Sequence, residues 1–182
     1  MTFKYRGNFP SENPAEALMT FGAIMRVRAR PSQECQRLFG REYDPEAVVP
    51  VNLMIDTGAA STCLDEAIMT KLQLLPVRHA SVKGVSGIAD LRPVFLMSFD
   101  IALAEEATDK KKTGIFTTPV RGIPPLGSLF GIQIDGLIGR NFLQFFRFNY
   151  SGPAGTWELI ESAPADAEKK PTKKRHSRYT GH

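Results

Sequence analysis

The residues with the clearest chemical potential are Asp56, Thr57 and Gly58, which directly follow the apolar run 53–55. A carboxylate placed next to so much apolar sequence is expected near the protein interior, where an unneeded charge is costly. Aspartate and glycine are also common turn residues, so the tripeptide alone fits a strand that ends in a turn equally well. The tripeptide therefore nominates Asp56 as a catalytic acid and leaves both interpretations open.

Two later segments change the balance between these interpretations. The first is Gly84-Val85-Ser86-Gly87, and the second is Leu137-Ile138-Gly139-Arg140-Asn141. Taken in this order with Asp56-Thr57-Gly58-Ala59, they resemble the retropepsin-like aspartic proteases, which include the retroviral proteases and similar single-domain proteins of bacteria and retroelements. The resemblance covers roughly residues 20–161. It implies an all-β fold, a small closed β-barrel of the retropepsin (acid protease) type with one short C-terminal helix, active as a homodimer.

The resemblance also implies roles for individual residues. Asp56 matches the catalytic aspartate, and Thr57 matches the residue whose hydroxyl bonds across the dimer below the aspartates. Gly58 matches the residue that lets backbone and substrate approach closely. The expected substrate-binding positions are Ala59 and the tip of a flap, formed by Gly84, Val85, Ser86 and Gly87. The layer expected to support the active-site loop consists of Leu137, Ile138, Gly139 and Arg140.

Ala60 departs from the retroviral pattern. In that pattern an acid directly after Asp-Thr-Gly-Ala pairs with the arginine of the Gly-Arg-Asn segment. Arg140 therefore lacks its expected partner, and Asp65 or Asp135 are the alternatives. The missing acid is expected to affect contacts to the ends of the substrate and the stability of the dimer more than the catalytic chemistry.

The chemistry of this class needs two carboxylates close to one water, and such a pair shares a proton and titrates as a unit. The sequence contains no second Asp-Thr-Gly or Asp-Ser-Gly, so one copy supplies one aspartate. The expected function is an aspartic endopeptidase in which the two Asp56 carboxylates of a homodimer activate water against a peptide or protein substrate. The alternative is a non-catalytic dimeric module of the same fold that binds peptides or assists assembly.

Charge is concentrated at one end of the 182-residue chain. The net charge is +4, yet residues 1–161 hold 17 basic and 17 acidic residues, so the whole excess belongs to residues 162–182. A basic cluster can bind nucleic acid or an anionic membrane by charge alone, but a disordered, solvated tail is the plainer interpretation. The expected organisation is a flexible N-terminal arm (1–19), a protease domain (20–161) and a disordered basic tail (162–182).

No metal or other cofactor is expected. Cys35 and Cys63 lack metal-site spacing and are interpreted as free thiols in a reducing compartment, and His79, His176 and His182 are not clustered. Neither a secretory signal nor an apolar run long enough to span a membrane is recognisable, so the expected location is the cytoplasm.

Short strands separated by turn signals account for most of the expected structure. Met25, Val27 and Ala29 alternate with arginines, which indicates a half-buried strand. The region 65–72 fits either a short helix or a strand. The region 31–47 is expected to be a loop with room for a helical turn at 34–39, and 123–130 is expected to be a loop. Further expected elements are strands at 48–55, 94–103 and 114–121, a buried apolar run at 134–138, a hairpin with its tip inside 81–95, a helix at 140–146, and a hairpin formed by 146–150 and 156–160.

Overall fold

The computed structural model of the chain describes residues 2–9, 11–44, 46–83, 89–105, 108, 110–129 and 131–161. The expected flap tip, Gly84, Val85, Ser86 and Gly87, and the expected basic tail, 162–182, lie outside the described residues.

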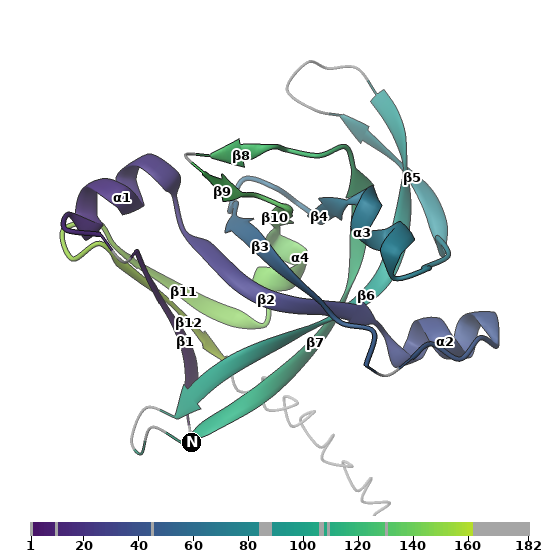
Figure 1. The fold of residues 1–182 in the computed structure, drawn as a ribbon, viewed down its shortest axis with the longest axis horizontal. Coiled ribbons are helices and arrows are strands. Elements are labelled where there is room, and N and C mark those ends of the chain that lie inside the picture. The colour runs from purple at the N-terminus through teal and green to yellow at the C-terminus, as the bar shows by residue number, and fades with distance from the viewer. Residues whose placement is uncertain are drawn as a thin grey trace, which may run out of the picture.

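Six strands close into a barrel (Figure 1). Around the barrel β2 pairs with β3, β3 with β10, β10 with β4, β4 with β7 and β7 with β6, and β6 pairs with β2 to complete the ring. The β3–β10 and β4–β7 pairs are parallel and the others antiparallel. The all-β closed barrel expected from the sequence is therefore confirmed. The six strands are β2 (Ile24–Pro31), β3 (Val49–Ile55), β4 (Thr62–Asp65), β6 (Ala89–Glu105), β7 (Lys111–Ile123) and β10 (Gly136–Ile138).

The barrel interior follows the alternation visible in the sequence. Met25, Val27 and Ala29 are buried, whereas Arg26 and Arg28 between them are exposed. This is the pattern that a strand with one buried face requires. Aromatic and aliphatic side chains from the other strands and from the helix that follows Gly139 complete the core, among them Leu53, Leu64, Met97, Phe99, Ile138 and Phe142.

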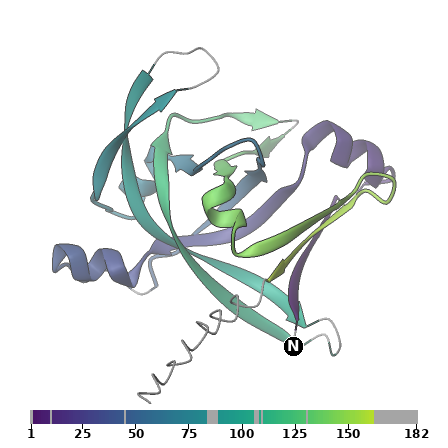
Figure 2. The ribbon, with the colours of Figure 1, turned by 180° about the vertical axis from the view of Figure 1, so that it is seen from behind.

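Three further strands extend the sheet beyond β6, in the order β6, β1, β12, β11. They are β1 (Phe3–Asn8), β11 (Phe146–Ser151) and β12 (Thr156–Glu161), and α1 (Pro14–Phe21) lies beside the β11–β12 turn (Figures 1 and 2). The expected β11–β12 hairpin is confirmed.

The expectation that residues 1–19 form a flexible arm is wrong for most of that segment. Strand β1 pairs with β12 along five residue pairs, from Lys4–Ile160 to Asn8–Thr156. Gly7 leaves room for the ring of Trp157, since an added Cβ would lie 2.0 Å from it. Pro14 begins α1 rather than breaking structure, because a helix tolerates proline in its first turn, where no backbone donor is needed.

The remaining elements connect these strands along the chain. They are α2 (Gln33–Phe39), α3 (Glu66–Lys71), α4 (Arg140–Leu143), β5 (Arg78–Lys83), β8 (Ser128–Leu129) and β9 (Ile132–Gln133). The helical turn considered at 34–39, within the loop expected at 31–47, is present as α2, which begins one residue earlier, directly after the capping hydroxyl of Ser32. The loop expected at 123–130 contains one strand of a small hairpin, and the helix expected at 140–146 ends three residues earlier.

Within the described ranges, no helix is both long enough and apolar enough to cross a membrane.

Candidate active site

Asp56 lies directly after the last residue of β3 and is half-buried. Its Oδ1 accepts hydrogen bonds from the backbone N–H of Gly58 (2.8 Å) and Ala59 (3.2 Å). Its own backbone N–H donates to the carbonyl of Ile138 (3.0 Å). Among the described residues no hydrogen bond reaches Oδ2. The turn therefore fixes one carboxylate oxygen and leaves the other without a hydrogen bond within the described ranges.

Strand β10 supports the Asp56 loop from behind. It runs parallel to β3, with Ile138 opposite Ile55, and both Ile138 and Gly139 are buried. A Cβ added to Gly139 would lie 2.4 Å from the carbonyl carbon of Ser61 and 2.8 Å from the amide nitrogen of Thr62. Because backbone cannot yield as a flexible side chain can, only glycine permits this close approach.

Arg140 binds the backbone of the Asp56 loop. Its Nη1 donates to the carbonyls of Thr57 (3.0 Å) and Gly58 (2.8 Å). The alternative partners expected from the sequence have other roles, since Asp65 caps α3 through Ala67 N–H and Asp135 accepts from the amide of Asn52. Arg140 thus replaces an ion pair to a carboxylate with two hydrogen bonds to carbonyls of the loop.

Asn141 is a support residue to which sequence reasoning gave no role. Its Oδ1 accepts from both the amide (2.7 Å) and the hydroxyl (2.9 Å) of Thr62. Its Nδ2 donates to the Thr118 hydroxyl (2.9 Å) and the Pro119 carbonyl (2.7 Å). The Thr62 hydroxyl in turn accepts from Gly139 N–H. A threonine at a buried strand position, here Thr62, was the signal in the sequence that such a partner must exist.

The face of the barrel that bears Asp56 carries a row of half-buried side chains. In register, Met54 of β3 lies opposite Leu137 of β10, Leu137 opposite Cys63 of β4, and Cys63 opposite Arg121 of β7. Residues directly opposite each other project from the same face, and Asp56, two residues after Met54, projects there too. Leu137 therefore lies on the Asp56 face, whereas the neighbouring Ile138 enters the core.

The charges at this face affect the thiol of Cys63. Burial raises the pKa of Cys63, the positive charge of Arg121 opposes this, and the negative charge of Asp56 raises the pKa further. The half-buried thiol is therefore weakly nucleophilic, which argues against covalent catalysis by Cys63.

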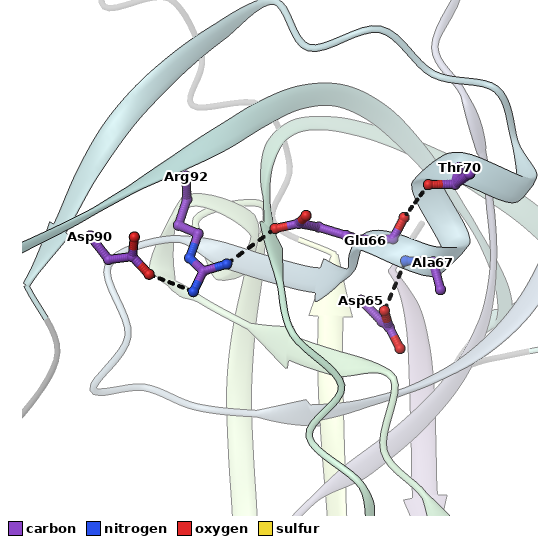
Figure 3. Close-up of polar contacts among 6 residues, drawn as sticks. All are labelled: Asp65, Glu66, Ala67, Thr70, Asp90 and Arg92. Carbon is purple, nitrogen blue, oxygen red and sulfur yellow. Dashed lines mark hydrogen bonds and ion pairs between the residues drawn. The ribbon is translucent and has the colours of Figure 1, made fainter.

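The hairpin of β5 and β6 projects from the barrel on the side of α3 (Figure 1). Midway along the hairpin, Arg92 of β6 pairs with Asp90 (2.5 Å) on its own strand and with Glu66 (3.4 Å) on α3 (Figure 3). The first turn of α3 is held by Asp65, whose carboxylate accepts from Ala67 N–H. Arg92 thus connects the hairpin that would bear the flap to the end of the barrel.

The site offers carboxylate chemistry. Among the residues that the structure describes, His, Cys, Asp and Glu side chains gather nowhere in groups of three that could hold a metal ion. A hollow of about 630 Å³ lies between α2 and strands β6 and β7, and Asp56 does not line it. Asp56 therefore lies outside that hollow.

The closed barrel, the Asp56 turn at the end of β3 and the glycine-bearing strand behind it together make this a retropepsin-like fold. No protein-family model and no curated protein matches the chain. Among solved structures, the chain is similar to a retropepsin-like aspartic protease from Rickettsia conorii (14% identity, 88% of this chain and 93% of that chain, TM-score 0.42). It is also similar to the EIAV protease in complex with an inhibitor (22% identity, 52% and 75%, TM-score 0.27). These likenesses concern the fold and say nothing of activity.

The expected site residues separate into three groups. Asp56, Thr57, Gly58 and Ala59 form one turn, Arg140 binds it, and Gly139 packs against Ser61 and Thr62 just beyond it. Leu137 and Ile138 are adjacent but face opposite sides of the sheet. The expected flap residues, Gly84 to Gly87, are outside the described ranges, so their role stays a prediction.

Proposed function

We propose that the chain is an aspartic endopeptidase that is active as a homodimer, with one Asp56 from each copy. The observation that carries the proposal is the hydrogen bonding of the two Asp56 carboxylate oxygens. Oδ1 is held by two backbone amides, whereas Oδ2 has no hydrogen-bond partner among the described residues of its own chain. A carboxylate oriented in this way, at an exposed turn after a buried strand, has the geometry of one half of a carboxylate pair.

The proposed reaction needs both halves. Two carboxylates that share one proton cannot both be ionised at close range. The ionised carboxylate takes a proton from a bound water as the water oxygen attacks the peptide carbonyl carbon, and the protonated carboxyl donates to the carbonyl oxygen. The tetrahedral diol then collapses as its C–N bond breaks, and the amine leaves with a proton. The consumed water is shared between the new acid and the new amine.

The supporting residues fit this mechanism because they make the turn rigid. Arg140 holds the carbonyls of Thr57 and Gly58, and Asn141 holds Thr62 at the other end of the loop. Positioned groups contribute to catalysis only when their neighbours fix them in place. In the proposed dimer Thr57, which is exposed in the protomer, lies at the contact between the two copies.

The sharpest test mixes two proteins. Asp56→Asn should abolish cleavage of a peptide library across several pH values and leave the fold and the dimer intact. If each site needs two Asp56 carboxylates, an exchanging equimolar mixture of wild type and Asp56→Asn should contain only about one quarter active dimers. Asp44→Asn is the matched control, and a mixture of it with wild type should keep the wild-type activity. The Asp44 carboxylate accepts a hydrogen bond from Glu46 N–H and has no proposed part in the reaction.

Sedimentation over a range of concentrations complements this test. Activity should rise with the dimer fraction. An Asp56→Asn protein that cleaves as well as the wild type, or a mixture that retains about half of the wild-type activity, as independent sites would, would contradict the proposal. A strict monomer that binds peptides without cleaving them would favour the non-catalytic module, which the missing acid at Ala60 motivates. The expected cytoplasmic location stays a prediction.

A further inference from the structure

Arg121 is a cation on the face that carries the proposed catalytic carboxylate. It lies directly opposite Cys63 in the parallel β4–β7 pair, and Cys63 lies opposite Leu137. The side chains of this row are half-buried and stand outside the hydrophobic core cluster. A peptide extended over this face would therefore meet Arg121 as well as apolar side chains.

Within the part of the chain that the structure describes, Arg121 takes part in no ion pair and no side-chain hydrogen bond. Gly122, the next residue of β7, lies against the side chain of Glu66. A Cβ added to Gly122 would lie 2.6 Å from Glu66 Cγ. Successive residues of a strand project to opposite faces, so this contact is on the other side of β7 from Arg121. Glu66 is also engaged by Arg92 (Figure 3). A half-buried guanidinium loses hydration, and a carboxylate from a ligand would restore its interactions.

The electrostatic effects on the pKa of Cys63 agree with the placement of Arg121 and Asp56 on one face. The charges of Arg121 and Asp56 act with opposite sign on the pKa of the same thiol. Both charges therefore lie within effective Coulomb range of one sulfur atom, although their strands are separated by β10 and β4.

The sheet geometry gives the distance between the end of β3 and Arg121, and hence the number of substrate residues that span it. Three spacings of about 4.8 Å separate β3 from β7, which places the Arg121 backbone about 14 Å from the end of β3. The side chain reaches part of this distance. An extended peptide rises about 3.3 Å per residue, so Arg121 meets a side chain about two to four residues from the bond above Asp56.

We propose that Arg121 makes the enzyme prefer substrates with an aspartate or glutamate two to four residues from the scissile bond. This inference rests on the proposed function, since it assigns the substrate class of the same site. The planar guanidinium can bind a carboxylate through two parallel hydrogen bonds, which an amide of the same shape cannot match. A twofold dimer holds two copies of Arg121, so the preference appears on both sides of the scissile bond.

The test uses matched peptide pairs that differ only by Asp/Asn or Glu/Gln at each position near the scissile bond. The wild type should cleave the acidic member about 10-fold better in kcat/KM at the preferred position. Arg121→Gln should reduce this ratio to about one, and Arg121→Lys should retain part of it. Arg147→Gln, at an exposed arginine of β11, is the control and should keep the wild-type ratio. Added salt should lower the ratio for the wild type and leave that of Arg121→Gln unchanged.

A binding measurement separates this inference from the proposed function. The same labelled peptide pairs are titrated against Asp56→Asn protein, with and without Arg121→Gln, and thermal unfolding verifies that each variant is folded. Tighter binding of the acidic member that disappears with Arg121→Gln supports the inference even if the wild type cleaves nothing. Cleavage with equal ratios at every position overturns it and leaves the protease proposal standing. Equal binding of both members, or binding of neither, also overturns it.

Discussion

Replacing Asn141 should reveal how strongly the Asp56 loop depends on its polar support. Asn141→Ala removes four hydrogen bonds, two received from Thr62 and two donated to Thr118 and Pro119. Thr62 is fully buried, so its amide and hydroxyl protons would be left without an acceptor in the core. Each such unsatisfied group costs about 1–3 kcal/mol, and we expect a loss of about 3–5 kcal/mol in the free energy of unfolding.

Asn141→Asp separates hydrogen bonding from side-chain volume, because the two residues have the same shape. An aspartate still accepts from Thr62, and the Thr118 hydroxyl can rotate to donate. Only the Pro119 carbonyl, 2.7 Å from Nδ2 in the native protein, would face a carboxylate oxygen. The expected loss is therefore smaller than for alanine, about 1–3 kcal/mol.

Urea unfolding at one fixed protein concentration measures both values, since a dimer makes stability depend on concentration. Asn149→Ala, at an exposed position of the edge strand β11, serves as the control and should change stability by no more than about 0.5 kcal/mol. If Asn141→Ala costs as little as the control, or if aspartate is worse than alanine, the hydrogen-bond network does not support the loop as argued.

Three further perturbations test other features of the molecule. Gly139→Ala should lower stability by about 3 kcal/mol, because its Cβ would meet backbone, whereas Gly152→Ala, with its nearest contact at 3.6 Å, should be nearly neutral in the same urea assay. The Arg6 hydrogen bond lowers the pKa of Glu158, so this carboxylate stabilises the fold above its unfolded pKa, and that stability is lost as pH falls through the folded value. Glu158→Gln should therefore cost about 0.5 kcal/mol at pH 7, and this cost should fade as the carboxyl becomes protonated at low pH, so a cost that grows on acidification would contradict the assignment. Mass-spectrometric alkylation of Cys63 should be slower than that of a free thiol, faster in Asp56→Asn and slower still in Arg121→Gln; the reverse order would show that these charges do not act on the sulfur as argued.

The barrel was predictable where one physical pattern dominates. The alternation of Met25, Val27 and Ala29 with arginines encodes a strand with one buried face, and the structure confirms it. Strand β1 was missed because it lacks such a pattern. Its buried positions hold Lys4 and Gly7, and only the packing of Trp157 against Gly7 explains why a glycine is needed. Burial there is decided by a residue at the far end of the chain, which no local window contains.

The candidate site was predictable as a list of residues but less so as a network. Asp56 and Gly139 could be named from motifs, and the structure brings their segments together. The partner of Arg140 could not be named, because the sequence suggests carboxylates and the guanidinium binds backbone carbonyls instead. The role of Asn141 could not be predicted for a related reason. Its partners, Thr62 and Thr118, come from separate strands that meet only once the barrel has closed.

The pairing of β1 with β12 has a consequence for how this protein is made. Strand β1 leaves the ribosome before every other described element, whereas its partner, which ends at Glu161, is among the last described segments to be synthesised. During translation the backbone donors and acceptors of β1 that face β12 have no strand to pair with. Such long-range pairing slows folding and leaves strand edges open to other chains. We therefore expect refolding to be slow, and truncation before Thr156 to convert a stable protein into one that aggregates through β1.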